Sequence, residues 1–385
     1  MEDDKTVRPQ DVGANTCKHI LEKFPDLKLP NLEKLGIMNV LGEDMGIMKK
    51  NPNAAYGKAA LAHIGADTFL GHQEIMGTKP KPPKMEPFSK SIDKVYNALK
   101  GTGYKVEYKG DKLKFLLVND RVTVADNIEA DLGQVYNLTT TFDLIPYEEL
   151  LEIGKIVRKN VKVSRVIVFG GKNVSIQNIL DAVEEKEGKY IGISAPKSGV
   201  YDEGYLVCHM GYGVDPKVQV PTIIGKEGIN VSLLGKVADI VSNEYGKSIP
   251  CVDTEKVMEL TLKEVKNMES GFICTNVQET DLAGHEQDAL KYAEKLSVAD
   301  KYIGYIMNEI SGNDRLIVMA DHGNDPVFGH GHHTREYVPL LIYGENLFPL
   351  CIGTRNTLSD VGATVADYFN KSKTENGTSF LDLIK

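Results

Sequence analysis

RLIVMADHGNDPVFGHGHHTRE, residues 315–336, carries the clearest structural signal in this chain. It opens with an apolar run, 315–321, of the kind that forms a strand buried on both faces of a parallel sheet. Asp321 and His322 follow the run, and open parallel sheets bind their ligands at the carboxyl ends of the strands. An Asp-His pair supplies one oxygen and one nitrogen ligand, which suits Mn²⁺ or Zn²⁺. The stretch therefore predicts a metal site.

Histidines gather in the same stretch. Four of the nine histidines lie within the twelve residues that start at His322. His330, His332 and His333 share one loop, so they can add nitrogen ligands to the same centre. The alternative is an exposed histidine-rich loop that binds no metal.

Apolar strands alternate with amphipathic helices around this stretch. Further strands are expected at 230–235, 271–277 and 338–344, and helices at 254–268, with Thr254 as N-cap, and at 288–310. The pattern predicts an α/β core with a mostly parallel sheet covered by helices on both faces. A Pro/Lys-rich break at 79–88 and a second break near 215–221 interrupt it. We therefore expect a core made of residues 1–85 and 218–385, with a smaller α/β cap domain inserted at 86–217.

Two other segments place reactive side chains after apolar runs or in short motifs. In NVQETDLAGH, 276–285, Asp281 and His285 are four residues apart, which can put both side chains on one side of a helical turn. The alternative is a polar loop in which Asp281 caps the following helix. In ADTFLGHQEIMG, 66–77, Thr68 offers a hydroxyl that metal coordination turns into a good nucleophile. Taken alone, this threonine more often caps a helix or turn.

Composition narrows the classes of function. The 385 residues are 42% hydrophobic and 26% charged, an ordinary globular composition, and their net charge of −9 argues against a nucleic-acid surface. No apolar run reaches membrane-spanning length, and no dinucleotide, P-loop or nucleophile-elbow motif occurs. Five scattered cysteines and a polar, acidic N-terminus predict reduced thiols and a cytoplasmic location. Nothing in the sequence points to a protein partner.

Several of these segments resemble known sequences. ADHGNDP, followed by HTREYVPLLIYG, resembles the C-terminal signature of the phosphopentomutases, which belong to the alkaline-phosphatase superfamily. DTFLGHQEIMG resembles their nucleophile motif, and DVGANTCKHI and GKVADI resemble further segments of their core. The resemblance covers most of both core segments.

The resemblance implies an isomerase that interconverts ribose (or deoxyribose) 1-phosphate and 5-phosphate through a bisphosphate. Two divalent ions are implied, Mn²⁺ in the first place, with Zn²⁺ or Mg²⁺ as alternatives. Thr68 would carry the phosphoryl group. One metal would be bound by Thr68, Asp321 and His322, and the other by Asp281, His285 and His333. Lys236 and Arg335 are expected to help beside the anionic groups of the substrate.

The sequence also departs from the family in three places. Family members begin with an apolar strand that ends in a metal-binding aspartate, whereas Asp3 and Asp4 stand in a polar tail, so we expect that strand to be missing here. D-L-A-G-H has the spacing of the related cofactor-independent phosphoglycerate mutases, which favours Asp281 over Thr280 as the ligand. In the cap, FGGK replaces the family's R-P-F-I-G, and no phosphate-gripping arginine is recognisable.

The leading prediction is therefore a metal-dependent phosphomutase that acts on a small phosphorylated substrate, a sugar phosphate. The departures in the cap leave two alternatives open. One is a phosphatase or another phosphotransferase that uses the same metal core on a different substrate. The other is a catalytically impaired homologue.

Overall fold

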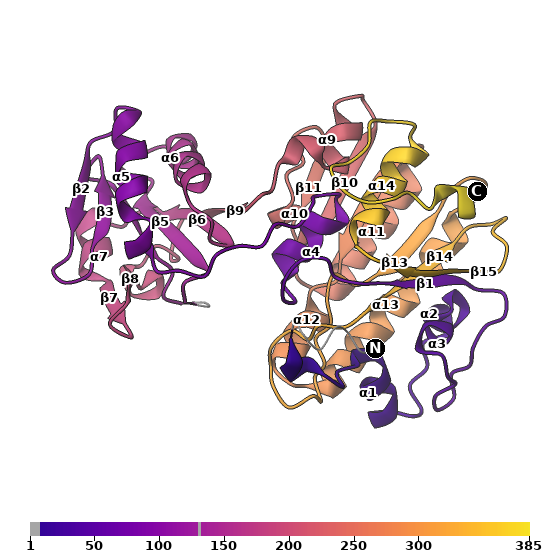
Figure 1. Ribbon diagram of the computed structural model, residues 1–385. Coiled ribbons are helices and arrows are strands. Elements are labelled where there is room, and N and C mark those ends of the chain that lie inside the picture. The colour runs from indigo at the N-terminus through magenta and orange to yellow at the C-terminus, as the bar shows by residue number, and fades with distance from the viewer. Residues whose placement is uncertain (1–7, 130–131) are drawn as a thin grey trace. The chain divides into compact units, whose positions relative to one another are not determined.

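The computed structural model of the chain describes residues 8–129 and 132–385 (Figure 1). The chain divides into two compact units, each with a hydrophobic core of its own. Unit 1 contains the residues up to Pro80 together with Asp215–Lys385, and unit 2 contains Lys81–Val214. Asp3 and Asp4, which the sequence places in a polar tail, lie outside the described residues.

Unit 1 holds two sheets. The first has three parallel strands in the order β11 (Lys247–Ile249), β10 (Asn230–Gly235) and β12 (Gly271–Asn276). The second has the order β13 (Leu316–Met319), β14 (Val338–Tyr343), β1 (Ala55–Ala59) and β15 (Leu350–Arg355). Within the described chain, β12 and β13 are edge strands of their sheets, and every residue in both is half-buried.

The expected α/β class is confirmed, and so are the four strands expected around the metal motifs. One strand departs from the mostly parallel arrangement, because β14 runs antiparallel to both of its neighbours, β1 and β13. A continuous apolar run reports burial on both faces of a sheet and carries no information about strand direction. The direction of β14 was therefore not readable from its sequence.

Helices pack on both faces of the sheets in unit 1. One face of β10 presents Leu234 to a core shared by α2 (Pro30–Leu35), α3 (Ile37–Leu41), α11 (Thr254–Asn267) and α13 (Ala289–Glu309). The other face presents Val231 and Leu233 to α9 (Val220–Gly225), α10 (Val237–Ile240) and α14 (Ser359–Tyr368). Near the N-terminus, α1 (Thr16–Lys23) packs through Ile20 on α13. This double cover explains the apolar composition of the strands.

The start of α11 corrects one expectation. Asp253 is its N-cap, and its carboxylate accepts a hydrogen bond from the Lys256 amide at 2.8 Å. Thr254, predicted as the cap, is the first helical residue instead. Asp and Thr are both common caps, so two of them in a row leave the exact boundary open to the sequence.

Unit 2 is a smaller α/β unit. Its main sheet has the order β2 (Val106–Lys109), β3 (Phe115–Val118), β4 (Val122–Asp126), β5 (Val135–Thr141), β6 (Arg165–Gly171) and β9 (Leu206–Gly211). One core joins this sheet to α5 (Ile92–Gly101) and α6 (Tyr147–Asn160). Smaller clusters involve α7 (Ile176–Asp181), α8 (Ala195–Ser198), β7 (Val183–Lys186) and β8 (Tyr190–Ile193).

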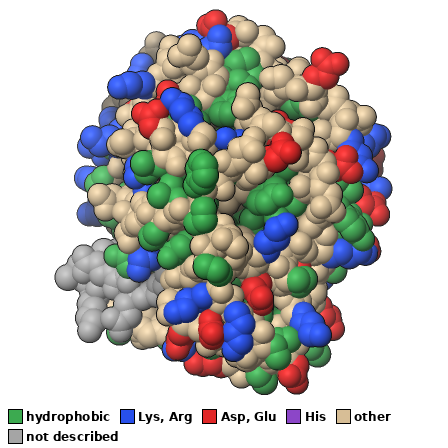
Figure 2. Space-filling view, turned by 90° about the vertical axis from the view of Figure 1, so that its right-hand side faces the viewer, with side chains coloured by type: hydrophobic (Ala, Val, Ile, Leu, Met, Phe, Trp, Pro, Cys, Tyr) green, Lys and Arg blue, Asp and Glu red, His purple; other side chains and the backbone are tan. Residues whose placement is uncertain are grey.

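The surface mixes charges of both signs. Figure 2 shows one face, on which lysine and arginine side chains stand among acidic and small hydrophobic groups. This distribution agrees with a chain that carries 45 basic and 54 acidic residues. Among the residues that the structure describes, no helix is both long enough and apolar enough to span a membrane.

Candidate active site

The predicted ligands emerge from two strand ends in unit 1. Asp321 and His322 follow β13 after one intervening residue, while Asp281 and His285 lie on α12 (Glu279–His285), shortly after β12. The four-residue spacing places both α12 side chains on one side of the helix, with His285 Nε2 3.5 Å from Asp281 Oδ1. Asp281 lies inside α12, whose N-cap position is Gln278, and the N-cap of the following helix, α13, is Asp288. The alternative role of Asp281 as a helix cap is therefore wrong.

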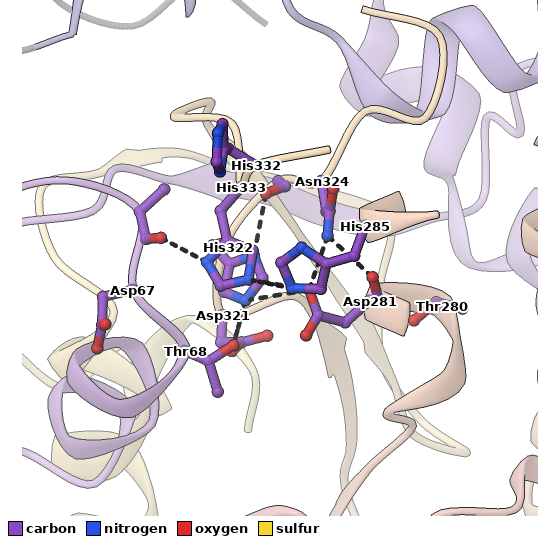
Figure 3. A network of polar contacts seen from close by, with 12 residues as sticks. Asp67, Thr68, Thr280, Asp281, His285, Asp321, His322, Asn324, His332 and His333 are labelled. Carbon is purple, nitrogen blue, oxygen red and sulfur yellow. Dashed lines mark hydrogen bonds and ion pairs between the residues drawn. The ribbon is translucent and has the colours of Figure 1, made fainter. Parts of the chain in front are cut away.

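Thr68 is the first residue of α4 (Thr68–Ile75). Its hydroxyl is hydrogen-bonded to Nε2 of His322, as Figure 3 shows. The N-cap of α4 is Asp67, whose carboxylate accepts the Leu70 amide at 2.8 Å. Because Asp67 caps the helix, the hydroxyl of Thr68 is directed at the histidine and is not used as a cap.

The structure brings the five predicted Asp and His ligands into one cluster with Thr68 (Figure 3). Asp281 Oδ1, His322 Nε2 and His333 Nε2 all lie within 4.8 Å of one another. His333 Nε2 is 3.1 Å from Asp281 Oδ1 and 3.1 Å from His285 Nε2. Asp321 joins the cluster through Oδ2, which lies 3.3 Å from His322 Nε2. Side chains separated by more than 250 residues, such as Thr68 and His322, thus meet at one point.

The cluster does not separate into the two predicted ligand sets. His322 Nε2 lies 3.3 Å from Asp321 Oδ2 and 4.0 Å from Asp281 Oδ1, so it stands between the carboxylates. The compact three-residue group joins His322 to Asp281 and His333, whereas the resemblance pairs it with Asp321 and Thr68. The assignment of ligands to two separate metal positions stays a prediction.

The orientation of the imidazoles fits a divalent ion. The Nδ1 atoms of His285, His322 and His333 donate to the carbonyls of Gly331 (2.7 Å), Gly323 (2.9 Å) and Ala66 (2.7 Å). A carbonyl only accepts, so Nδ1 carries the proton and Nε2 of the neutral ring presents a lone pair to the cluster. His285 and His333 then point two lone pairs at each other across 3.1 Å, which only a shared proton or cation stabilises.

The carboxylates add negative charge. Burial raises the pKa of Asp281, but the contacts with His285 and His333 outweigh it, and the net pKa lies far below the usual range. Burial also raises the pKa of Asp321, and the contacts with His322 and His72 again bring its net pKa below the usual range. Burial lowers the pKa of the His322 imidazole. Ionised carboxylates beside a neutral imidazole are the protonation states that a divalent ion requires.

Two residues that the sequence analysis missed orient the carboxylates. His72 Nδ1 lies 3.1 Å from Asp321 Oδ2, and Asn324 Nδ2 donates to Asp281 Oδ1 at 2.8 Å. Groups that hold metal ligands in place are a regular part of metal sites. Both residues stand inside the motifs quoted above. Each is a polar residue within four positions of a candidate ligand, and this proximity could have identified them from the sequence.

Two glycines permit the close packing of these motifs. A Cβ on Gly71 of α4 would stand 2.7 Å from the Asp321 carbonyl oxygen. A Cβ on Gly284 of α12 would stand 2.3 Å from Cγ of Asn324. Real Cβ atoms do not approach so closely, so both Gly-His pairs bring their helix against the loop after β13.

The two predicted helper residues have different surroundings. Lys236 Nζ lies 3.7 Å from Asp281 Oδ2, and Lys236 lines the same small pocket as Thr68 and Tyr292. Arg335 is buried, and its Nη1 donates to the carbonyls of His63 (2.6 Å) and Gly65 (2.7 Å). The Nη1 and Nη2 atoms of Arg335 bond the backbone, so these contacts lend no support to its predicted role beside the substrate, which stays a prediction.

The other histidines of the loop lie apart from the cluster. His332 is directed away from it in Figure 3. His330 Nε2 lies 3.8 Å from Asp11 Oδ1. Of the histidines in this loop, His333 is therefore the one whose ring nitrogen reaches the carboxylates.

Comparisons with known proteins show the family of this chain. A family model described as the metalloenzyme superfamily matches residues 5–373. A phosphopentomutase of Clostridioides difficile (strain 630) is 30% identical over 384 residues, which cover 95% of this chain and 92% of that protein. This chain belongs to the metalloenzyme superfamily and to the phosphopentomutase family. As a member of that family, the protein is an isomerase, a phosphomutase that binds divalent metal.

Two further comparisons show the range of similarity within and beyond the phosphopentomutases. The phosphopentomutase of Caldanaerobacter subterraneus subsp. tengcongensis is 32% identical over 396 residues, covering 96% of this chain and 91% of that protein. A solved structure, the PH0037 protein from Pyrococcus horikoshii, is 15% identical, covers 93% of this chain and 92% of that chain, and has a TM-score of 0.44.

Metal binding by this site is expected to weaken as the pH falls. The hydrogen bond with Asp281 raises the pKa of His285 above its usual value of 6.5. Below the raised pKa, the ring is protonated and its proton must leave before Nε2 can bind an ion. The Mn²⁺ affinity should therefore drop about tenfold for each pH unit below that pKa and level off above it. Isothermal titration with Mn²⁺ between about pH 6 and 8 measures this. An affinity that does not change with pH would contradict it.

Proposed function

We propose that this protein transfers a phosphoryl group between the 1- and 5-positions of ribose or deoxyribose phosphate through a phosphorylated Thr68. One observation carries the proposal: the Thr68 hydroxyl is directed into a cluster of two carboxylates and three imidazoles. The names of the relatives supply the substrate class. The cytoplasmic location stays a prediction.

We propose two divalent ions, with Mn²⁺ as the native metal. Asp321 and His322 would hold one ion beside Thr68, and the other would be held by Asp281, His285 and His333. When bound, such ions neutralise the phosphoryl oxygens and lower the pKa of the threonine hydroxyl. The convergent Nε2 atoms and the ionised carboxylates support metal binding at this cluster, while the division of the ligands between two ions follows the resemblance.

The chain's own residues would then act as follows. Phosphorylated Thr68 would pass its phosphoryl group to the free hydroxyl of the sugar monophosphate, whose proton moves to Oγ1 of Thr68, so that the sugar bisphosphate forms. Oγ1 of Thr68 would then form a bond to the other phosphorus while the bond from that phosphorus to the sugar oxygen breaks, and the threonine proton passes to the released sugar oxygen. The phosphorylated residue would sit at the N-terminus of α4, where the helix dipole favours an anion. The ammonium of Lys236, at the rim of the same pocket, would balance further negative charge.

A phosphatase remains the second candidate, and one observation favours it. β6 of unit 2 ends in Phe169, Gly170 and Gly171, and Phe169 packs on Tyr201 with ring centroids 6.1 Å apart. The phosphate-gripping arginine of the family has no counterpart there. Without such a clamp, the sugar phosphate can leave while Thr68 still carries a phosphoryl group. Water can then accept that phosphoryl group from Thr68.

One assay separates the two candidates. The protein is incubated with ribose 1-phosphate, Mn²⁺ and a trace of ribose 1,5-bisphosphate, and the products are followed by phosphorus NMR. Conversion to ribose 5-phosphate without free phosphate is the expected result. Release of inorganic phosphate would favour the phosphatase. Absence of both products, with Mn²⁺ bound, would remove the pentose phosphate assignment.

A further inference from the structure

The segment between β1 and α4, residues 60–67, leads directly into Thr68 and is held from one side by a single buried arginine. The guanidinium of Arg335 donates to the backbone carbonyls of Leu61, His63 and Gly65, the last two at 2.6 and 2.7 Å. Arg335 is 8% exposed, so water does not replace these bonds. The planar fork of an arginine suits three fixed acceptors better than the single ammonium of a lysine.

A buried glutamate holds the same segment through its amides. Glu74 of α4 is 1% exposed and accepts hydrogen bonds from the amides of Ala62 (3.1 Å) and His63 (3.0 Å). Its carboxylate also accepts hydrogen bonds from Nδ1 of His63 at 2.7 Å and from the Leu358 amide at 2.8 Å. Because Arg335 binds carbonyls of this segment and Glu74 binds its amides, the two side chains together hold the segment in one backbone conformation.

This arrangement connects the candidate nucleophile to the metal-ligand loop. Arg335 lies two residues after His333, whose Nδ1 donates to the carbonyl of Ala66 in the same segment. The Arg335 amide donates to Asp11 at 2.8 Å, which fixes the loop from the other side. A shift of Arg335 would therefore move the approach to Thr68 relative to His333 and its neighbours.

We infer that Arg335, supported by Glu74, is a positioning residue that sets the place of the Thr68 hydroxyl relative to the metal ligands. The inference rests on the proposed function for its kinetic consequence, but the hold on residues 60–67 is a separate physical claim. A group that binds substrate changes KM when it is removed. A positioning residue changes kcat, because misplacing the attacking atom by about 1 Å costs up to about 100-fold in rate.

The test compares Arg335→Lys with a matched variant, Arg315→Lys. Arg315 also donates to three backbone carbonyls, those of Gly312, Asp314 and Ile384, at the opposite, amino-terminal end of β13. Arg335→Lys should lower kcat by about 100-fold with KM changed by less than about threefold. Mn²⁺ stoichiometry should not change. Arg315→Lys should keep both kinetic constants.

Amide hydrogen exchange provides a readout that needs no activity. The amides of Ala62 and His63 should exchange at least about tenfold faster in Arg335→Lys, while the amides of β14 keep their protection. If Arg335→Lys fails to fold, Glu74→Gln replaces it and should show the same loss of kcat at constant KM and the same faster exchange.

Each result decides the inference. Raised KM with kcat preserved would assign Arg335 to the substrate and overturn it, and so would unchanged kinetics with unchanged exchange. If the unmodified protein transfers no phosphoryl group, the proposed function fails on its own. Faster exchange of Ala62 and His63 would then still support the hold on the segment, and unchanged exchange would refute it.

Discussion

Thr68→Ala should lower phosphoryl transfer by at least about 10⁴-fold, because the substitution removes the atom that accepts the phosphoryl group. The fold should be retained, since Asp67 and not Thr68 caps α4. The two carboxylates and three imidazoles remain, so Mn²⁺ should still bind. Steady-state kinetics with ribose 1-phosphate and bisphosphate primer, together with metal analysis, measure both effects.

A second threonine provides the control for this prediction. Thr280 lines the same pocket, but its hydroxyl donates to the Val277 carbonyl at 3.1 Å and is not directed at the cluster. Thr280→Ala should therefore change kcat by less than about threefold. Appreciable turnover in Thr68→Ala, or a large loss in Thr280→Ala, would show that the nucleophile is assigned to the wrong residue.

Asp281→Asn should weaken Mn²⁺ binding by more than about 100-fold and reduce activity accordingly. The carboxylate faces His285 and His333, and the substitution replaces one of its oxygens by an NH2 group that cannot bind a metal and removes its negative charge. The new amide can still pair with Asn324, so the fold should survive. Titration calorimetry and metal analysis after dialysis give the affinity and the stoichiometry.

Asp288→Asn is the matched control, because it makes the same chemical change a short distance along the chain. Asp288 is the N-cap of α13 and accepts the Lys291 amide at 3.0 Å. Asparagine caps helices as well as aspartate does, so stability and Mn²⁺ affinity should both be preserved. If Asp281→Asn binds Mn²⁺ as tightly as Asp288→Asn does, Asp281 is not a metal ligand.

Local sequence rules were enough to locate the polar groups of this site. The apolar run before Asp321 predicted a strand, and Asp321 does lie two positions after the end of β13. The four-residue spacing of Asp281 and His285 predicted side chains on one helical face, and α12 provides it. Both predictions depend on the periodicity of a single helix or strand, which residues close to one another in the sequence determine.

Features that depend on distant contacts were not readable in this way. Arg335 was expected beside the substrate, but it bonds the carbonyl of His63, which is 272 positions away in the chain. The position of His322 between two carboxylates likewise follows from the packing of α12 and α4 against the loop after β13. No spacing rule within one motif contains such information.

The most direct test of the central claim is to identify the phosphorylated residue. The protein is loaded with Mn²⁺, incubated with ribose 1,5-bisphosphate, quenched in acid and digested, and the peptide that contains residues 66–77 is sequenced by mass spectrometry. We expect one added phosphoryl group on Thr68, lost again after a chase with ribose 5-phosphate. Turnover with an unmodified Thr68, or with the phosphoryl group on another residue, would contradict it.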